Sequence, residues 1–370
     1  MAIRPAITLI TCVAFGAAVL TPPWCRRGAD DVFDGSLEAD RAWARGVHRW
    51  TTTKLDPEAF ATGSELFDGE WLFGTHVMAA LGFLQTALRH PELRAQHVAW
   101  AEASVDAILS ERVRAFDRGR HGEDPLDTLH EDGAHAAYLG YLGVVLGLLR
   151  RIDPDTRHKA LHDRIAAALR RRIEAGDNGL VATYPGEWYP VDNLAVLATL
   201  RTAGGHDAFV DATLAAFTKK YVDPDTGLLV QAVDASGRVV DGPRGSGTTL
   251  GAYFAAYADP PLARRLALAV ERELARDVFE MGWVREYPAG HDGHGDIDSG
   301  PILFGAGLSA TGFGLATARL ANDREAFAAR WAMATLWGAP LQVDGARQWV
   351  VGGPLGNAIL FAMTTVEVSL

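Results

Sequence analysis

The alternation of helical segments with connections of two lengths constrains the fold of this chain most strongly. Helical periodicity recurs at about 36–51, 74–89, 95–113, 134–150, 157–175, 193–203, 207–219, 247–258, 260–275, 301–320, 324–337 and 354–365. Short connections alternate with long ones, which cover about 52–73, 114–133, 176–192, 220–246, 276–300 and 338–353. When antiparallel helices pair through short turns, all the longer loops lie on the same side. The pattern therefore predicts an all-α (α/α)6 toroid of six helical hairpins, with a superhelical solenoid as the alternative.

The composition of the helices favours two layers. Segments that follow long loops, such as 139–149, 304–316 and 353–362, are rich in small residues, which allow inner helices to approach closely. Segments that precede long loops, such as 157–174, carry one charged face and suit the outside. The long loops also contain short β-type stretches at 179–184, 227–233 and 347–351, which predict small β-hairpins on one rim.

The N-terminus has the pattern of a targeting segment. An apolar run from Ala6 to Leu20 follows Arg4 and precedes the pair Arg26-Arg27. A run of about fifteen residues suits the core of a signal peptide better than a full membrane span. We therefore expect residues 1–27 to be a signal peptide or membrane anchor, attached through residues 5–21, and residues 28–370 to form one domain. The expected location is periplasmic or extracellular.

Composition excludes several classes of partner. The net charge is −11 and the basic residues form no stripe, so the chain lacks the surface of a nucleic-acid-binding protein. A hydrophobic content of 48% provides a sizeable core. There is no P-loop and no strand–Gly-x-Gly-x-x-Gly–helix unit, so we expect no cofactor. The expected partner is a small-molecule or glycan substrate, and nothing in the sequence indicates an oligomeric state.

The stretch from His291 to Ala316 is the first candidate site. Its polar half contains two histidines and three aspartates, and its second half is apolar and rich in small residues. Pro301 is expected at the start of a helix over 301–320. Asp298 would then lie at the helix start and point into a shared centre, either as an acid or as a helix cap. The histidines, spaced His-x-x-His on a loop, lack the ligand pattern of a zinc site, so we assign no metal.

Loop 176–192 alternates aromatic and acidic residues, and its two prolines fix the backbone as a preorganised wall would require. Glu187, beside Trp188, is expected to have a raised pKa and to act as a general acid. Asp192 is either catalytic or an N-cap. On the presumed inner helix, the Tyr141 hydroxyl either donates to a reacting oxygen or bonds the backbone of the core.

The remaining candidates lie on other long loops. Asp68 and Trp71 would supply a carboxylate and an aromatic platform, unless they only cap and pack the helix. Arg285 would bind substrate, unless it pairs with Glu286. We interpret most of loop 114–133 as a solvated loop. The candidate catalytic residues are Asp298, Asp296, Asp192, Glu187 and Tyr141, and the candidate substrate-binding residues are Asp68, Trp71, His76, Tyr184, Trp188, Asn193, Arg285 and His294.

Two segments carry a resemblance to a known family. The stretch Ala137–Leu142 and the stretch from Thr183-Tyr184-Pro185 to Asp192-Asn193 resemble the linalool dehydratase/isomerase family, whose members fold as (α/α)6 toroids. The resemblance implies that Tyr141 occupies the position of a catalytic histidine, and that Thr183 and Asp192 occupy the positions of two catalytic cysteines. Because the histidine and both cysteines are absent, the chemistry must differ or must use Asp192, Tyr141 and other acids.

A second, shorter resemblance involves Asp296-Ile297-Asp298-Ser299. This run is similar to the D-x-D-D acid motif of class II terpene cyclases, whose central aspartate protonates an alkene. The resemblance implies that Asp298 is the matching acid.

Three functions are compatible with these residues. The first is an acid/base lyase or isomerase that acts on a hydroxylated, largely apolar, isoprenoid-like molecule. The second is a glycoside-processing hydrolase or lyase with paired carboxylates, and the third is a toroid that binds a partner without catalysis.

Overall fold

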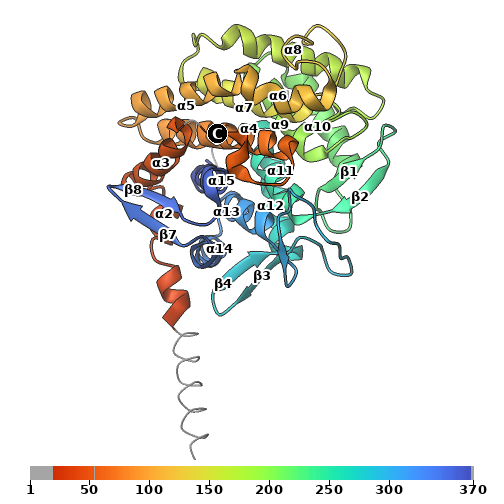
Figure 1. Cartoon of the computed structure of the whole chain (residues 1–370). Coiled ribbons are helices and arrows are strands. Elements are labelled where there is room, and N and C mark those ends of the chain that lie inside the picture. The colour runs from red at the N-terminus through yellow and green to blue at the C-terminus, as the bar shows by residue number, and fades with distance from the viewer. Residues whose placement is uncertain (1–19, 54, 368–370) are drawn as a thin grey trace, which may run out of the picture.

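A computed structural model describes residues 20–53 and 55–367, and this part of the chain is mostly helical with a few two-stranded sheets (Figure 1). The first nineteen residues of the expected signal or anchor segment lie outside the described residues. The helices are α2 (Ala29–Phe33), α3 (Leu37–Thr52), η1 (Pro57–Phe60), α4 (Glu65–Arg89), α5 (Arg94–Ile108), α6 (Glu111–His121), α7 (Ala136–Ile152), α8 (Lys159–Ala175), α9 (Pro190–Ala203), α10 (Asp207–Tyr221), α11 (Gly245–Ala258), α12 (Pro260–Glu273), α13 (Leu308–Ala321), α14 (Arg324–Gly338) and α15 (Gly353–Thr365).

Each sheet is an antiparallel hairpin between neighbouring strands of the chain. The strands are β1 (Val230–Val233), β2 (Val239–Pro243), β3 (Ala275–Val278), β4 (Met281–Val284), β5 (Ile302–Leu303), β6 (Ala306–Gly307), β7 (Pro340–Val343) and β8 (Ala346–Trp349). The predicted stretches 227–233 and 347–351 contribute β1 and β8. The stretch 179–184 forms no strand, and only Tyr184 makes a bridge, to Glu187.

Three expected helices have different boundaries. Helix α4 begins at Glu65, nine residues earlier than expected, so Asp68 and Trp71 lie on it rather than on a loop. The segment 95–113 divides into α5 and α6, because Ser110 leaves the helical conformation and its hydroxyl accepts a hydrogen bond from the Val113 amide at 3.4 Å. The interpretation of 114–133 as a solvated loop is therefore wrong for residues 114–121, which belong to α6 and include the buried Phe116 and Asp117.

The expected helix over 301–320 begins later, at Leu308, so Pro301 is not its first residue. Strands β5 and β6 occupy part of the interval and pair as a hairpin. Phe304 and Gly305 form the turn, and both have positive φ values, 52° and 83°. Positive φ at both central residues is the geometry of a type I′ hairpin turn. The hairpin therefore lies between the polar residues 291–299 and the start of α13.

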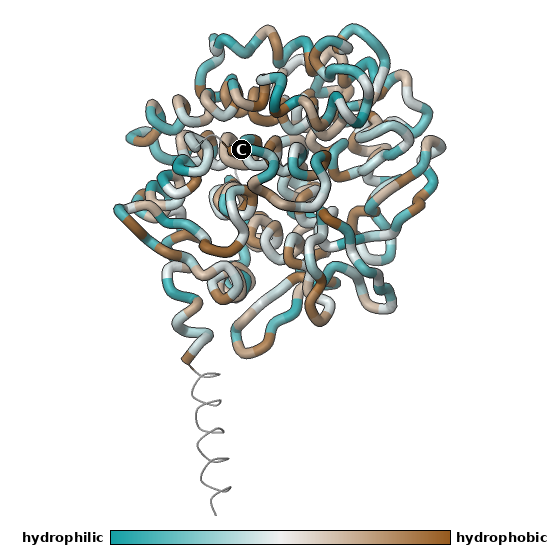
Figure 2. Tube along the Cα trace, viewed as in Figure 1, coloured by the Kyte–Doolittle hydropathy of each residue, from teal (hydrophilic) through white to brown (hydrophobic). Residues whose placement is uncertain are grey.

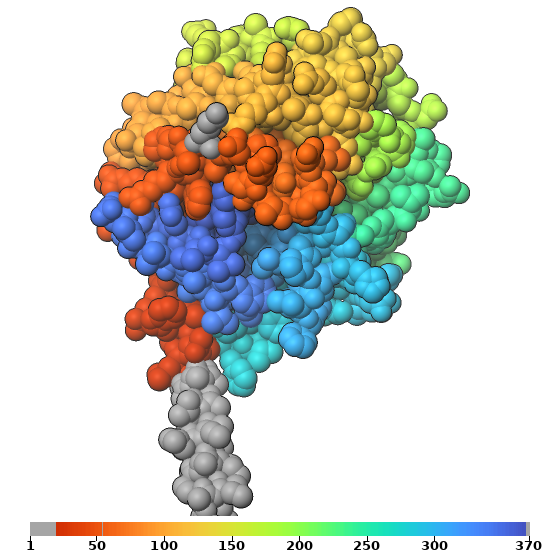
Figure 3. All heavy atoms as spheres, viewed as in Figure 1, coloured from red at the N-terminus to blue at the C-terminus, as the bar shows by residue number. Residues whose placement is uncertain are grey.

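The helices that follow the longer connections are neighbours in space. Helices α4, α7, α9, α11, α13 and α15 pack against one another in this order, and α15 packs back against α4. The remaining long helices pack on them: α5 on α4, α8 on α7 and α9, α10 on α9, α12 on α11 and α13, α14 on α13, and α3 on α15 and α4. Figure 3 shows the consequence at the surface, where the segment of α4 lies directly beside the C-terminal segment.

Small residues allow α7 and α9 to approach closely, as the composition predicts. A Cβ atom on Gly143 would lie 2.3 Å from the Thr199 side chain, which is closer than any real contact. The Thr199 hydroxyl uses this proximity to donate to the Gly140 carbonyl at 2.9 Å. The glycine face of α7 is therefore part of a helix interface.

A buried polar network fills the space between α4, α11 and α15. The Gln85 amide donates to the hydroxyls of Tyr253, at 2.7 Å, and Tyr257, and the Thr365 hydroxyl donates to the Gln85 carbonyl at 2.5 Å. All these side chains are buried. This level of the helix assembly is therefore filled by side chains that satisfy one another.

Most of the described large apolar residues are buried, but some on the small sheets and hairpin turns are exposed. Figure 2 marks the hydrophobic residues along the chain in brown, and they occur on the hairpins as well as on the helices. Phe279 at the β3–β4 turn and Phe304 at the β5–β6 turn are among the most exposed. Among the described helices, α4 alone is long and apolar enough to cross a membrane by length and composition. Of its most apolar window, 83% is buried inside the protein, as expected for a core helix.

Candidate active site

Asp192 is the centre of a hydrogen-bonded group at the start of α9. Its Oδ1 accepts a hydrogen bond from the Tyr141 hydroxyl of α7 at 2.7 Å, and its Oδ2 accepts one from the Thr183 hydroxyl at 2.7 Å. The N-cap residue of α9 is Tyr189, and its side chain makes no capping hydrogen bond. Asp192 is therefore not the N-cap, and its carboxylate binds side chains. The group unites the three positions singled out by the dehydratase/isomerase resemblance.

The environment raises the pKa of Asp192 to about 6. Burial is the largest cause, and the negative charge of Asp298 adds to it, while the hydrogen bonds from Thr183 and Tyr141 act in the opposite direction. An acid with this pKa is mostly ionised near neutral pH and can still accept a proton at little cost.

Tyr141 is held between aromatic rings. Its ring stacks on Phe254, with 4.5 Å between centroids, and lies 6.4 Å from the ring of Phe73. Burial and the charge of Asp192 raise the pKa of the Tyr141 hydroxyl well above its ordinary value. Tyr141 therefore remains protonated and donates to Asp192 throughout the physiological range.

Asp298 lies ten residues before the first residue of α13, so it cannot cap that helix. Its side chain is accessible to water, but neighbouring residues displace part of the water around its carboxylate. This desolvation raises its pKa to about 7, helped by the charges of Glu70 and Asp296 and opposed by Arg120 and Arg244. No described side chain or amide donates a hydrogen bond to its carboxylate. Asp298 thus has the properties of a proton donor that can reach a bound molecule.

Asp296 has a different environment. Its Oδ2 pairs with Nη1 of Arg244 at 2.5 Å, and its Oδ1 accepts a hydrogen bond from the Ser299 amide at 2.9 Å. The Ser299 hydroxyl in turn accepts from the Asp296 amide at 2.9 Å. These contacts fix the loop that carries Asp298, and they give Asp296 a positioning role.

Glu70 is a further acid of the site that the sequence analysis did not select. It lies near the start of α4, where its Oε1 accepts a hydrogen bond from the Tyr184 hydroxyl at 2.6 Å and its Oε2 lies 3.7 Å from Nη2 of Arg120. The Arg120 guanidinium lies over the Tyr184 ring, 4.1 Å from its centroid. Burial raises the pKa of Glu70 above its ordinary value. The helical start at Glu65, which the sequence analysis placed later, is what brings Glu70 to this position.

Side-chain hydrogen bonds and one backbone pairing hold the loop before α9. The Asn193 side chain accepts from the Val181 amide at 2.8 Å and donates to the Val181 carbonyl at 3.0 Å, so it fixes the loop. Glu187 accepts a hydrogen bond from the Tyr189 hydroxyl at 2.8 Å. Trp188 is half-buried, and its backbone pairs with Val233 of β1.

The other predicted residues do not join the group around Asp192. Asp68 accepts from the Thr62 amide at 2.8 Å, and Trp71 packs against Phe60. His76 is buried, and this burial lowers its pKa to about 4. His294 is exposed.

Arg285 and Glu286 do not form the ion pair that we considered. The Glu286 carboxylate is completely buried and accepts hydrogen bonds from the Ser246 hydroxyl at 2.6 Å and the Ser246 amide at 3.2 Å, which holds the first turn of α11. Burial raises the pKa of Glu286 to about 7. The Glu286 carboxylate therefore stabilises the start of α11.

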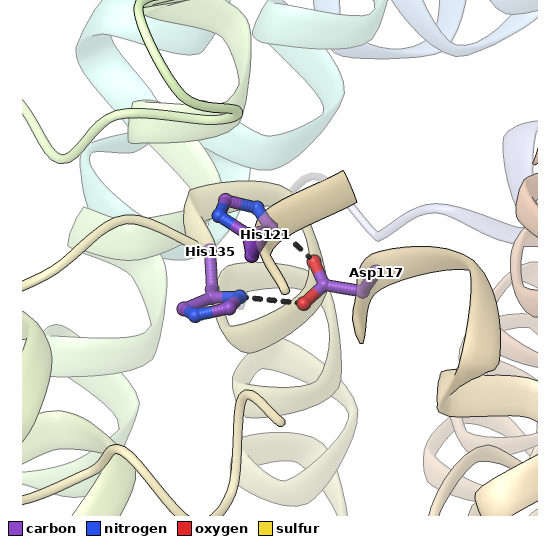
Figure 4. Close-up of side chains that lie close together, drawn as sticks. All are labelled: Asp117, His121 and His135. Carbon is purple, nitrogen blue, oxygen red and sulfur yellow. Dashed lines mark hydrogen bonds and ion pairs between the residues drawn. The ribbon is translucent and has the colours of Figure 1, made fainter. Parts of the chain in front are cut away.

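A second cluster, Asp117, His121 and His135, lies beside the acids (Figure 4). His135 Nδ1 lies 2.5 Å from Asp117 Oδ2, and His121 Nε2 lies 3.7 Å from Asp117 Oδ1. The His121 ring centroid lies 6.0 Å from that of Tyr184, the hydrogen-bond partner of Glu70. The sequence analysis missed this cluster because it placed 114–133 in a solvated loop, although the i, i+4 spacing of Asp117 and His121 on a helix is a signal for a shared face.

A cavity of about 710 Å³ lies at the other ends of α7, α9 and α11, where Gly147, Arg201 and Tyr257 contribute to its lining. It contains none of the candidate residues. No family model matches the chain, and no curated protein matches it.

Proposed function

We propose that residues 28–370 form one (α/α)6 toroid, with α4, α7, α9, α11, α13 and α15 as its inner ring. The support is their packing in chain order and the return of α15 to α4. In this arrangement the first turns of the inner helices share one rim, where Asp192 of α9, Glu70 of α4 and the loop that carries Asp298 would meet. We also propose that residues 1–27 direct export, either as a signal peptide that is cleaved or as an anchor that stays in the membrane.

We infer that the chain is an acid/base enzyme of the lyase or isomerase type. The observation that carries this proposal is the hydrogen-bonded group of Tyr141, Thr183 and Asp192. The dehydratase/isomerase resemblance selects these three positions from two separate segments, and they lie in direct contact. The carboxylate of Asp192 would replace the family's thiol and imidazole groups as the base.

The proposed reaction is the removal of water from an alcohol. Protonated Asp298 donates its proton to the substrate hydroxyl, the C–O bond breaks, and water leaves with the bonding electrons. The Asp192 carboxylate removes a proton from the adjacent carbon, and that C–H electron pair becomes the new C=C bond. One proton is donated and one is removed, so the protons balance. Addition of water to the product at a different carbon, with the proton transfers reversed, gives an isomeric alcohol.

Positive charge that develops on carbon would be stabilised by nearby groups. The face of Tyr141 offers aromatic electron density, and the carboxylate of Glu70 offers opposite charge. The hydrogen bonds from Tyr141 and Thr183 orient Asp192 before the substrate arrives, which is how preorganised groups contribute to a rate.

A hydroxylated, largely apolar, isoprenoid-like substrate fits the residues of the proposed ring. Leu250, Leu355, Ile359 and Leu360 on inner helices are only half-buried. Apolar residues left partly exposed near a few polar groups are typical of small-molecule sites. The polar contacts would fix the hydroxyl, and the apolar ones would bind the chain.

The test is a screen of terpenoid and other tertiary or allylic alcohols with the wild-type protein, Asp298→Asn and Asp192→Asn, with product detection by gas chromatography. Each variant should lower kcat by about 10²–10⁴-fold. Because Asp192 must be ionised and Asp298 protonated, the wild-type rate should rise as pH passes about 6 and fall as it passes about 7. Asp163→Asn, on the outer helix α8, is the control. Full activity of Asp298→Asn would refute the assignment.

Glycoside processing is the second candidate, because Glu70, Asp192 and Asp298 influence one another's titration. Glycoside hydrolysis requires such a pair of carboxyls, one protonated and one ionised. Release of reducing sugar from oligosaccharides in the same assay would favour this reaction over dehydration. A purely binding role is less well supported, because neither Asp192 nor Asp298 acts as a helix cap.

A further inference from the structure

The cluster of Asp117, His121 and His135 contains the ligand types of a transition-metal site. Two imidazoles and one carboxylate are a frequent set for Zn²⁺ and related ions. One ligand atom from each residue lies within 4.8 Å of the others. Asp117 and His135 are almost completely buried, and the side chain of His121 is 3% exposed. We propose that these three residues bind one divalent transition-metal ion.

The atoms that face one another lack partners within the described protein. Asp117 Oδ1 and His121 Nε2 are both buried, and neither makes a hydrogen bond to a described residue. A buried polar atom without a partner is unfavourable, so these two atoms favour a ligand that satisfies both. The two atoms are 3.7 Å apart. Two ligands that each lie about 2.1 Å from one ion in tetrahedral geometry are roughly 3.4 Å apart, so small shifts suffice.

His135 supplies the third ligand through Nδ1. This nitrogen lies 2.5 Å from Asp117 Oδ2, and the two atoms form a hydrogen bond through one proton. An ion would replace that proton, and the two atoms would separate by less than about 1 Å to reach the spacing of coordinated ligands. The rings of His121 and His135 already lie 3.8 Å apart, so both can face one ion.

The other side of each imidazole has a suitable supporting group. His135 Nε2 lies 3.6 Å from Oε1 of Glu123, and the backbone of Thr183 lies close to the His121 ring. Metal-binding histidines commonly donate their second ring nitrogen to a carboxylate or a backbone carbonyl, which fixes the ring. Both histidines have such an acceptor nearby.

The site would tie three segments together. Asp117 and His121 lie on α6, and His135 directly precedes α7. Through His121 the ion would also support Thr183, whose hydroxyl donates to Asp192. The ion therefore has a positioning role at the wall of the proposed active site. The proposal that an ion binds here does not depend on the reaction proposed for that site.

The test uses the full chain after treatment with a chelator and removal of the chelator. Zn²⁺ or Co²⁺ is added, unbound ion is removed, and bound metal is counted by mass spectrometry. We expect one ion per chain, a visible Co²⁺ absorption spectrum typical of nitrogen and oxygen ligands, and a higher Tm with Zn²⁺, because the ion binds only the folded state. Asp117→Asn and His121→Ala should each weaken binding at least about 10-fold.

His130→Ala is the matched control, because His130 belongs to the same loop and is exposed. It should bind Zn²⁺ as the wild type does. Circular dichroism establishes whether each variant folds, and the Co²⁺ spectrum of the wild type does not depend on any variant. The proposal is overturned if the wild-type chain binds no stoichiometric ion, or if His121→Ala and Asp117→Asn bind it as tightly as His130→Ala.

Discussion

At the scale of single residues, environment separates the carboxyl groups of the candidate site into different roles. Asp296 is neutralised by Arg244 and Glu286 is held by Ser246, whereas Asp298 has water access without a partner. Asp192 alone accepts two side-chain hydroxyls. The sequence predicts that acids gather here, but it cannot distinguish paired acids from unpaired ones. That distinction depends on partners such as Arg244 and Ser246, which are distant in the chain.

Tyr141→Phe tests the coupling between Tyr141 and Asp192. The hydrogen bond from Tyr141 lowers the pKa of Asp192, so its removal should raise that pKa above about 6. The base must be ionised, and the ascending limb of the pH–rate profile should therefore move to higher pH, with kcat lowered roughly 10–100-fold.

Tyr138→Phe is the control for this variant. Tyr138 lies on the same helix and donates to the Ile108 carbonyl at 2.9 Å, away from Asp192. It should lose stability without a shift of the ascending limb. An unshifted limb in Tyr141→Phe would show that Asp192 is not the titrating base.

At the scale of elements, the periodicity predicts most helices well because their buried faces repeat along the sequence. Two of its failures occur where a local capping or turn signal outweighs periodicity. Ser110 ends one apolar pattern and begins another helix, and Phe304-Gly305 closes a hairpin inside an apolar run. The second failure displaced Asp298 from a helix start, and the first concealed Asp117 and His121. Both errors therefore affected the candidate sites more than the fold.

The glycine interface of α7 gives a prediction at this scale. In Gly143→Ala the new Cβ would overlap the Thr199 side chain at 2.3 Å, so α7 and α9 must separate. Overpacking of this kind costs about 1–3 kcal/mol. Gly119→Ala on α6 meets no atom within 4 Å and should stabilise the protein by roughly 0.5–1 kcal/mol.

Urea denaturation of the two glycine variants beside the wild type measures the difference. Equal free energies of unfolding for the two variants would contradict the close approach of α7 and α9. The comparison is matched, because both changes add one methyl group to a helical glycine and differ only in what that methyl group meets.

At the scale of the whole molecule, the sequence predicts alternating helices but not how the two ends of the chain come together. Closure depends on contacts between residues hundreds of positions apart. Arg319 of α13 donates to the carbonyls of Val32, Phe33 and Val366 at distances of 3.1, 2.7 and 3.1 Å. One buried guanidinium thus joins the beginning of the described chain to its end. No periodicity in the sequence indicates such an arrangement, since each carbonyl belongs to an otherwise unremarkable residue.

Arg319→Met tests whether this junction stabilises the molecule as a unit. The substitution retains much of the side-chain volume but leaves three carbonyls without their charged donor, at a cost of about 1–3 kcal/mol for each buried acceptor that water cannot reach. Arg324→Met is the matched control, because Arg324 forms exposed pairs with Asp30 and Asp34, which contribute little. Calorimetry should show a lower Tm for Arg319→Met, by several degrees, with a single transition retained, and a Tm within about 2 °C of wild type for Arg324→Met. If the first variant instead melts in two transitions, the ends of the chain unfold separately, and Arg319 joins two units rather than closing one.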